Sequence, residues 1–155
     1  MSKFKIVLVA PEIPGNTGSI GRTCVALDLE LILIKPLAFD ISEKAVRRAG
    51  LDYWKHVNLK IYENFLDFLE NEKPVNDQMI FFSRFAIKPI YEATFKKDCY
   101  LIFGSETRGL DEEITHSYPD SLVTLPMYSE HIRSLNLSNA ATAAAYEALR
   151  QIHFP

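Results

Sequence analysis

Arg22 and Asn16 are the first residues in this sequence whose types and spacing could bind a charged ligand. They lie six residues apart, near the start of a segment with helical apolar spacing, so both side chains could face one pocket. An arginine inside an otherwise apolar helix is expected to bind a phosphate or a carboxylate. A solvent-exposed arginine is the alternative interpretation. The pair therefore indicates a site for an anionic ligand.

A second candidate is the stretch 125–151, which is polar in its first half and rich in alanine in its second. Alanine stands where a core helix normally carries leucine or isoleucine, so we expect another backbone to pack closely against it. Asn136 or Ser138 can cap this helix, which we expect over 140–151. A polar loop that ends at a capped helix start offers free donors to a ligand. An ordinary surface loop before an alanine-rich helix is the alternative.

Other motifs that could carry chemistry are weak. Gly15 and Gly18 match neither the dinucleotide fingerprint nor a P-loop. The segment 104–106 is not a nucleophile elbow, which argues against a hydrolase. Glu106 and Arg108 could form an ion pair that shapes their loop. None of the four histidines shows metal-ligand spacing, so we expect no metal; they are His56, His116, His131 and His153.

Aromatic residues suggest two contacts with RNA or with a partner. Tyr146 in the alanine-rich helix either fills a gap in the core or faces a partner chain or a nucleotide. Arg47 and Arg48, close to Tyr53 and Trp54, combine cations with stacking rings, which is a recurring way to hold RNA. An ordinary amphipathic surface explains them nearly as well. A net charge of −3 lowers the expectation of nucleic-acid binding, although a local basic patch would suffice.

Length and composition predict a soluble globular protein with one domain, 1–155. Hydrophobic residues make up 48% of the chain and charged residues 24%. No apolar run reaches the length of a membrane span, and the first residues lead directly into a predicted strand instead of a signal peptide. Cys24 and Cys99 are read as reduced, buried thiols, so we expect a cytoplasmic protein without membrane partners.

Apolar runs and turn residues alternate along the chain as in an α/β protein with a mainly parallel sheet. We predict strands at 5–10, 30–34, 57–62, 79–83, 100–104 and 122–125, and helices at 19–27, 42–48, 64–71, 111–116 and 140–151. The segment 11–18 is read as a loop, and 89–94 as a short helix or turn. Ligands bind at the carboxyl ends of parallel strands. The loops 12–18, 104–109 and 126–139 are therefore predicted to meet at one site.

Three segments together resemble the motifs of one enzyme family. Asn16 followed by Arg22 resembles the first motif of the SpoU class of SPOUT methyltransferases. The segment 101–110 (LIFGSETRGL) resembles the second motif, and 125–127 (LPM) with 133–140 (RSLNLSNA) resembles the third. The segments 11–18 and 47–53, with the short chain length, resemble the TrmL-type subgroup. The resemblance covers nearly the whole chain.

The resemblance implies a fold, a cofactor and an activity. It implies a parallel sheet with helices on both faces and a C-terminal trefoil knot, which general connection rules argue against. It also implies S-adenosylmethionine held in a bent form, a homodimer packed through the knot, and no separate RNA-binding extension. The implied activity is methylation of the ribose 2′-hydroxyl of the wobble nucleotide, a cytidine or modified uridine at position 34, in leucine tRNAs. The alternatives are another tRNA or rRNA position, or a non-catalytic knotted RNA-binding factor.

The family motifs also assign roles by position. The residues implied to contact the cofactor are Phe82 or its neighbour Phe81, Gly104, Leu125 and Ser134. Those implied to line the reacting centre are Asn16, Arg22, Glu106, Ser134 and Asn136, with Tyr146 from the last helix. Family likeness points to Arg22 as proton acceptor or activator. An arginine is a poor base because its pKa normally exceeds about 12. We therefore expect Arg22 to bind the substrate phosphate and stabilise the forming alkoxide, without a metal.

Overall fold

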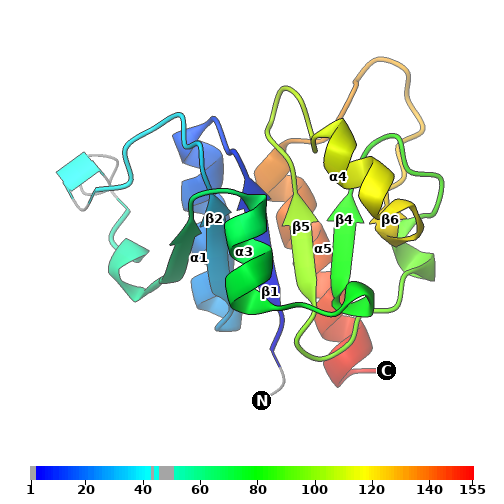
Figure 1. Cartoon of the computed structure of the whole chain (residues 1–155), viewed down its shortest axis with the longest axis horizontal. Coiled ribbons are helices and arrows are strands. Elements are labelled where there is room, and N and C mark those ends of the chain that lie inside the picture. The colour runs from blue at the N-terminus through cyan, green and yellow to red at the C-terminus, as the bar shows by residue number, and fades with distance from the viewer. Residues whose placement is uncertain (1–2, 43, 46–50) are drawn as a thin grey trace.

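Six parallel strands form one sheet in the order β3-β2-β1-β5-β4-β6 (Figure 1). The structure is a computed structural model that describes residues 3–42, 44–45 and 51–155. The strands are β1 (Lys5–Val9), β2 (Glu30–Ile34), β3 (Asn58–Tyr62), β4 (Met79–Phe82), β5 (Tyr100–Phe103) and β6 (Leu122–Val123). All five strand pairings are parallel, with register pairs such as Val7↔Ile32 and Val7↔Ile102. The predicted α/β class is confirmed.

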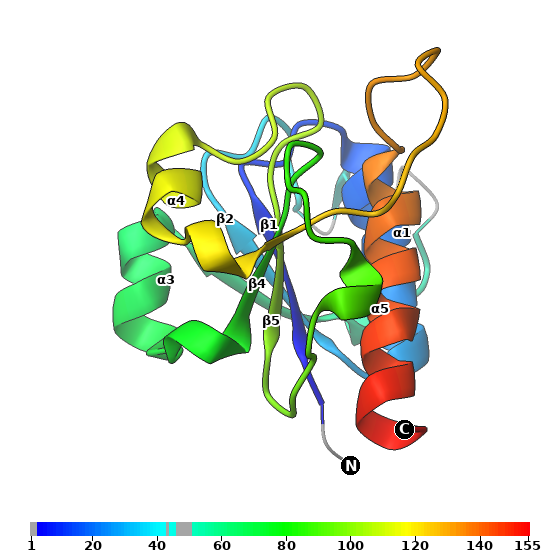
Figure 2. The same ribbon diagram turned by 90° about the vertical axis from the view of Figure 1, so that its right-hand side faces the viewer.

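The central strands are apolar on both faces because helices cover both faces. The helices are α1 (Pro14–Leu27), α3 (Phe65–Glu72), α4 (Glu112–Ser117) and α5 (Leu137–His153). Short 3-10 turns are η1 (Trp54–His56), η2 (Asn76–Gln78), η3 (Ile90–Glu92) and η4 (Pro119–Ser121). In Figure 2, α1 and α5 lie on one side of the sheet, and α3 and α4 on the other. The expected helices on both faces are confirmed.

The alanine-rich helix α5 packs against α1 and β5, as its small side chains predicted. Its inward face has no exposure at all and consists of Ala141, Ala144, Ala145 and Ala148. The hydroxyls of Thr23 in α1 and Thr142 in α5 lie 2.8 Å apart, which joins the two helices directly. Residues this small let the helix backbones approach closely, so α5 is thin where it is buried.

Several predicted element boundaries were wrong, most clearly those of two helices, and part of one prediction lies outside the described residues. Helix α1 begins at Pro14 instead of residue 19, because proline is favoured in the first turn of a helix and glycine does not prevent continuation. Helix α5 begins three residues earlier than predicted and ends at His153. Of the helix predicted at 42–48, residues 42 and 44–45 are described: 42 lies in a bend, so the predicted start there is wrong, and 44–45 are helical. The segment 89–94 contains the turn η3.

The two cysteines are fully buried and unpaired, as predicted. Burial raises the pKa of the Cys24 thiol to about 12, and the same cause, partly offset by hydrogen bonds, raises that of Cys99 to about 12. Both therefore act as small apolar residues in the core. Among the helices that the structure describes, none is long and apolar enough to cross a membrane.

A buried carboxylate ties the sheet to α3 near the amino ends of β1 and β5. The Glu72 side chain is only 4% exposed. It accepts hydrogen bonds from the Lys5 ammonium (2.8 Å), the Tyr100 hydroxyl (3.0 Å) and the Tyr62 hydroxyl, and pairs with Lys60 at 3.3 Å. Burial alone would raise the pKa of Glu72, but the bonds from Lys5, Tyr62 and Tyr100 lower it to about 2. This cluster stays charged and joins three strands to one helix.

Candidate functional site

The three polar loops meet at the carboxyl ends of the strands through a chain of hydrogen bonds. The Glu106 carboxylate accepts from the main-chain N–H groups of Glu12 (2.8 Å) and Ile13 (2.7 Å). It also accepts from the Asn16 side-chain amide at 3.2 Å. The Asn136 amide in turn donates to the Asn16 oxygen at 3.0 Å. The predicted convergence of the loops after β1, β5 and β6 is therefore confirmed.

Glu106 is placed by a tight turn that only glycine permits. Main-chain bonds between Ser105 and Gly109 close the turn, at 3.2 and 2.9 Å. A Cβ atom on Gly104 would lie 2.0 Å from the Gly109 carbonyl carbon, so any side chain there would displace the loop. The turn aims the Glu106 carboxylate at the start of α1, whose N-cap residue Ile13 has no side chain to bond the helix amides. A negative charge is favoured at that helix end.

Glu12 completes the connection between the first two loops. Its carboxylate accepts from the Thr107 amide (3.0 Å) and from the Thr107 hydroxyl (2.7 Å). The Thr107 bonds lower the pKa of Glu12, and Arg108 adds a weaker effect in the same direction. The Glu106 carboxylate thus binds the loop after β1, and the Glu12 carboxylate binds the loop after β5. The expected Glu106–Arg108 ion pair is wrong: it is absent from the pairs among the described residues, because Glu106 is turned toward α1.

The third loop enters the site through the cap of α5. The Asn136 oxygen accepts from the amides of Ser138 (2.9 Å) and Asn139 (3.2 Å), which confirms Asn136 as the predicted cap. Its amide group remains to bind Asn16, so one side chain caps α5 and holds α1. Asn16 is 7% exposed, and its amide nitrogen bonds Glu106 while its oxygen bonds Asn136. The starts of the two helices are thereby fixed relative to each other.

The residues assigned to the cofactor lie beside this chain of bonds with unequal exposure. Phe82 is buried and stacks on Phe103, with ring centroids 4.5 Å apart. Phe81 faces the opposite side of the sheet, where it stacks on Tyr118. Leu125 is half-buried against the same core cluster as Phe82. Of the two phenylalanines, Phe82 is therefore the one on the Leu125 side of the sheet.

The loop 125–135 keeps its main-chain groups largely unpaired. No amide of these residues donates to a main-chain carbonyl within the described part of the chain. The loop is fastened instead by the Arg84 guanidinium, which donates to the Arg133 carbonyl at 3.4 Å, and by the Ser129 hydroxyl, which accepts from the His131 amide. Ser134 is exposed. The loop therefore presents N–H and C=O groups that a bound molecule could satisfy.

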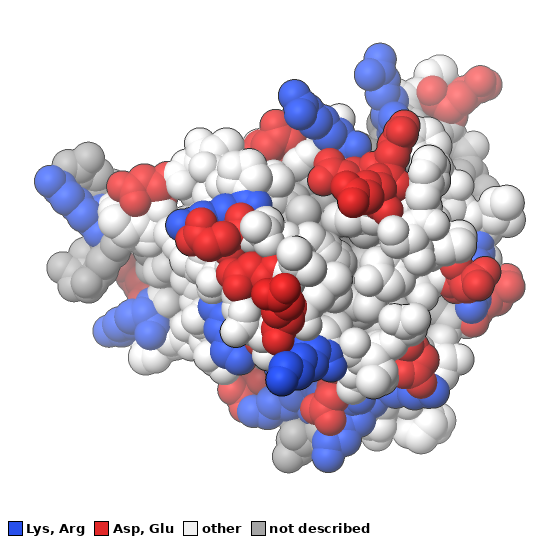
Figure 3. Space-filling model, in the orientation of Figure 1, with Lys and Arg blue, Asp and Glu red and all other residues white. Residues whose placement is uncertain are grey.

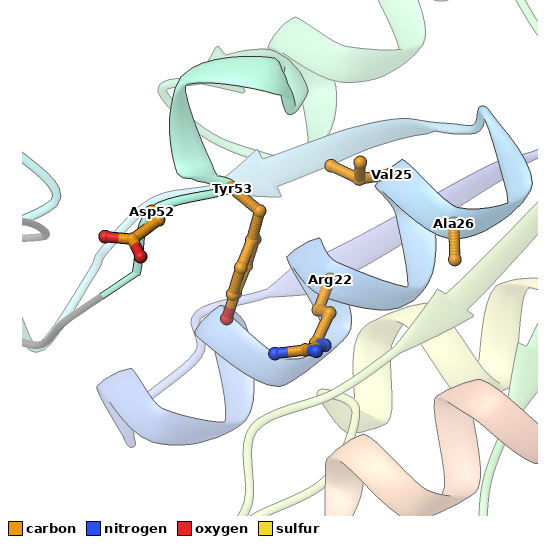
Figure 4. A pocket seen from close by; sticks show the side chains of 5 residues that line it. All are labelled: Arg22, Val25, Ala26, Asp52 and Tyr53. Carbon is orange, nitrogen blue, oxygen red and sulfur yellow. The ribbon is translucent and has the colours of Figure 1, made fainter.

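Arg22 is exposed on α1 and carries no ion pair among the described residues. Its guanidinium lies 5.5 Å from the centre of the Tyr53 ring. The two side chains border an open hollow of about 410 Å³, lined by Arg22, Val25, Ala26, Asp52 and Tyr53 (Figure 4). Without an ion pair among the described residues, the guanidinium is available to an anionic group, although the Asp52 carboxylate lines the same hollow. Arg22 is not part of the hydrogen-bonded chain that joins Asn16, Glu106 and Asn136.

The remaining predicted contacts have mixed outcomes. Tyr146 is 52% exposed, so it does not fill a gap in the core, and the prediction that it faces a partner chain or a nucleotide stays open. Trp54 is half-buried against the core cluster and not a free stacking ring. Arg47 and Arg48 lie outside the described residues. Acidic and basic side chains are interspersed on the face shown in Figure 3, so that face carries no broad basic field.

Sequence reasoning did not single out Glu12 or Thr107, and it named Tyr53 only as a possible stacking ring for RNA, not as a neighbour of Arg22. Glu12 and Thr107 bond across more than ninety positions of sequence (|i−j| = 95), so no local pattern reveals them. A usable signal existed for Tyr53, because the glycines at 18 and 21 leave one face of α1 open to a packed segment. Among the described residues, no cluster of three or more His, Cys, Asp or Glu could hold a metal.

A comparison with protein-family models decides the family. The model described as "SpoU rRNA Methylase family" matches residues 3–146. The chain belongs to the SpoU methylase family. The motif resemblance at Asn16–Arg22 and in the second and third segments is confirmed at the level of the family.

Relatives extend this match over nearly the whole chain. The tRNA (cytidine(34)-2'-O)-methyltransferase of Burkholderia cenocepacia is 39% identical over 152 residues, covering 97% of each chain. A Lactococcus lactis protein provisionally named for the same reaction is 45% identical over 152 residues, covering 96% of this chain and 89% of its own.

Solved structures share the fold. One described as giving structural insights into the 2-OH methylation of C/U34 on tRNA superposes with a TM-score of 0.88. It is 42% identical and covers 97% of this chain and 96% of its own. The SpoU methyltransferase AviRb from Streptomyces viridochromogenes, solved in complex with AdoMet, gives a TM-score of 0.76 at 27% identity. That match covers 97% of this chain and 61% of AviRb.

Proposed function

We propose that this chain, acting as one catalytic domain over 1–155, transfers a methyl group from S-adenosylmethionine to the ribose 2′-hydroxyl of nucleotide 34 in tRNA. The observation that carries the proposal is the set of hydrogen bonds that joins Asn16, Glu106 and Asn136, with Asn16 on the helix that also carries Arg22, which has no ion pair among the described residues. Relatives of similar length, named for methylation of cytidine 34, support this choice of nucleotide. We further propose leucine tRNAs as substrates, with cytidine or a modified uridine at the wobble position.

The residues near the loops fit the proposed cofactor. The unpaired main-chain groups of 125–135 suit the polar edges of an adenine and the hydroxyls of a ribose. Phe82 and Leu125 supply an apolar wall, and Gly104 and Ser134 lie at the ends of the loops that would border the cofactor. We propose that these loops belong to a trefoil knot, consistent with the thin, alanine-lined α5. S-adenosylmethionine, when bound, supplies an electrophilic methyl group on a sulfonium.

In the proposed mechanism, Arg22 acts on the substrate oxygen. Its guanidinium binds the phosphate next to the target ribose and stabilises the charge that forms as the 2′-hydroxyl loses its proton to a phosphate oxygen or water. Glu106, Asn16 and Asn136 hold α1 against the loops, so they fix where Arg22 stands. Correct placement of the nucleophile supplies much of the rate in such reactions.

A homodimer fits the exposure of Tyr146. This ring lies on α5, outside the contact between α5 and α1, and is 52% exposed. We propose that it faces a second copy of the chain or the bound nucleotide, and that the enzyme works in the cytoplasm on mature tRNA. A ring with this exposure in an alanine-rich helix is well placed to form such a contact.

The proposal is tested by incubation with methyl-labelled cofactor and either bulk tRNA or rRNA, followed by mapping of 2′-O-methyl marks. We expect label on tRNA at nucleotide 34, and on leucine isoacceptors when purified species are compared. Label on rRNA or at another tRNA position would overturn the assignment, and absence of any label would favour a non-catalytic RNA-binding factor.

Arg22→Ala and Arg22→Lys test the mechanism in the same assay. Both variants should lose about a hundredfold or more of turnover while binding the cofactor as the wild type does, because lysine cannot replace the planar guanidinium. Cofactor binding is measured by calorimetry. Wild-type turnover in Arg22→Ala would show that the guanidinium takes no part in the reaction.

A further inference from the structure

Tyr53 is the aromatic neighbour of Arg22 in the described structure. The Tyr53 ring lies 5.5 Å from the guanidinium carbon, within the range of a cation–π contact. In Figure 4 the ring and the guanidinium lie next to each other at the same hollow, Tyr53 before η1 and Arg22 on α1. The long arginine side chain has no carboxylate to hold it there among the described residues. The ring is therefore the group that limits where the guanidinium lies.

The Tyr53 hydroxyl also reaches the backbone that carries Arg22. It donates to the Gly18 carbonyl at 2.8 Å. In an α-helix the carbonyl of residue 18 is also the acceptor for the amide of residue 22. One side chain thus contacts the guanidinium with its ring and the preceding helical turn with its hydroxyl. Burial raises the pKa of Tyr53 while the charge of Arg22 lowers it, so the hydroxyl stays a donor at neutral pH.

The segment around Tyr53 is seated on α1 by close packing. A Cβ atom on Gly21 would lie 2.6 Å from the Trp54 ring, so glycine at this position lets the segment approach the helix. Trp54 and Val57 pack against the core from there. Tyr53 therefore lies on a segment that packs closely against α1, next to Arg22. Its hydroxyl bonds Gly18, which comes 35 positions earlier in the chain.

We propose that Tyr53 is a positioning residue that holds the Arg22 guanidinium in its active orientation; this rests on the proposed function, in which Arg22 acts on the ribose oxygen. The ring restricts the guanidinium, and the hydroxyl fixes the ring to the same helical turn. Arginine recognises a phosphate through a fixed fork of donors, so its direction matters as much as its charge. Loss of the ring leaves the charge of Arg22 unchanged but no longer restricts the orientation of its guanidinium.

The first test is a double-mutant cycle in single-turnover methylation of bulk tRNA with excess enzyme. Tyr53→Leu should lower the rate about tenfold or more while the dissociation constant of S-adenosylmethionine stays unchanged. Tyr53→Phe keeps the ring and should stay within about threefold of wild type. In an Arg22→Ala background, Tyr53→Leu should change the remaining rate by less than about twofold, because its effect passes through Arg22. Tyr91→Leu, which removes a 68% exposed tyrosine in η3, is the matched control.

The second test does not depend on activity. The side-chain Nε–Hε resonance of Arg22, assigned by its loss in Arg22→Ala, should carry a ring-current shift in wild type and in Tyr53→Phe. The same resonance should move toward those of the other exposed arginines in Tyr53→Leu, or in Tyr53→Met if the leucine variant melts below the assay temperature. An unchanged resonance without the ring, or an undiminished effect of Tyr53→Leu in the Arg22→Ala background, would overturn the proposal. If wild type methylates no RNA, the proposed function fails, and the resonance alone decides the role of Tyr53.

Discussion

Two glutamates at opposite ends of the sheet are held by different kinds of donor. Glu72, near the amino ends of the strands, is bonded only by side chains, two of them cationic. Glu106, at the carboxyl ends, is bonded by two main-chain amides and one side-chain amide, with no cation. Side-chain donors neutralise the Glu72 charge, whereas main-chain donors fix where the backbone of another loop runs. One carboxylate therefore serves mainly stability, and the other mainly the placement of loops.

The difference also shows in what each carboxylate joins. Glu72 links α3 to β1, β3 and β5, elements that already share a packed apolar cluster with Phe68 at its centre. Glu106 links loops at the surface of the sheet edge, where the bonds between Glu12 and Thr107 are a second connection. Removing a buried charge partner in a packed region costs free energy of unfolding. Removing a loop tie changes geometry at modest cost in that free energy.

Glu72→Ala should show the largest effect on stability. It leaves Lys5 partly buried without its main partner and removes acceptors from two tyrosine hydroxyls. We expect a loss of about 3 kcal/mol in the free energy of unfolding, measured by urea denaturation. The single-turnover methylation rate of the folded fraction should stay near wild type. A large loss of rate with unchanged stability would reverse the contrast between the two glutamates.

The pH dependence of stability should carry the signature of Glu72. Its pKa is lowered from an ordinary 4.5 to about 2 in the folded state. The carboxylate therefore contributes stability at pH values above 4.5, and this contribution is lost as pH falls from 4.5 toward 2. Urea denaturation should show that the free energy of unfolding falls less between pH 7 and pH 3 in Glu72→Gln than in wild type. Equal falls in the two proteins would mean that other carboxylates carry the acid sensitivity.

Glu106→Gln should reverse the pattern, with a large loss of activity and a small loss of stability. The amide keeps one acceptor oxygen, but its NH₂ group cannot accept from the Glu12 or Ile13 amides. We expect the methylation rate to fall about a hundredfold as the loops move apart, with a loss of about 1–2 kcal/mol in the free energy of unfolding. Glu113→Gln, an exposed acid on α4, is the control and should be neutral.

The amino-acid pattern predicted the sheet more fully than the site. Continuous apolar runs such as 5–10 and 100–104 identified the buried strands, because strands buried on both faces read as uninterrupted apolar runs. The edge strand β3 has no buried residue and was predicted from a weaker pattern. The alanines of α5 predicted close packing because a helix that must lie near another backbone has little room for side chains. Helix starts were harder: Pro14 lies among turn-forming residues that also suit a first helical turn.

The site could be located but not assembled from the pattern. That three loops would meet follows from the carboxyl ends of parallel strands lying at one edge. Which atoms bond could not be predicted. Glu106 was expected to pair with Arg108, two residues away, but it bonds Asn16 in α1, which lies 90 positions earlier in the chain. Local spacing reports only on local contacts. Partners brought together by the sheet, such as Glu12 with Thr107, need the fold itself.

Asn136→Ser should give the smallest effect and the finest test of the contrast. Serine caps helices about as well as asparagine, so the free energy of unfolding should change by less than about 0.5 kcal/mol. Serine cannot reach Asn16 with an amide, so the bond between the starts of α5 and α1 is lost. We expect the methylation rate to fall about tenfold because α1 and its Arg22 are then held on one side only. Asn136→Ala loses both the cap and the tie and should add a stability loss of about 1 kcal/mol. Equal rates in wild type and Asn136→Ser would show that the Glu106 side of the chain positions α1 without help from α5.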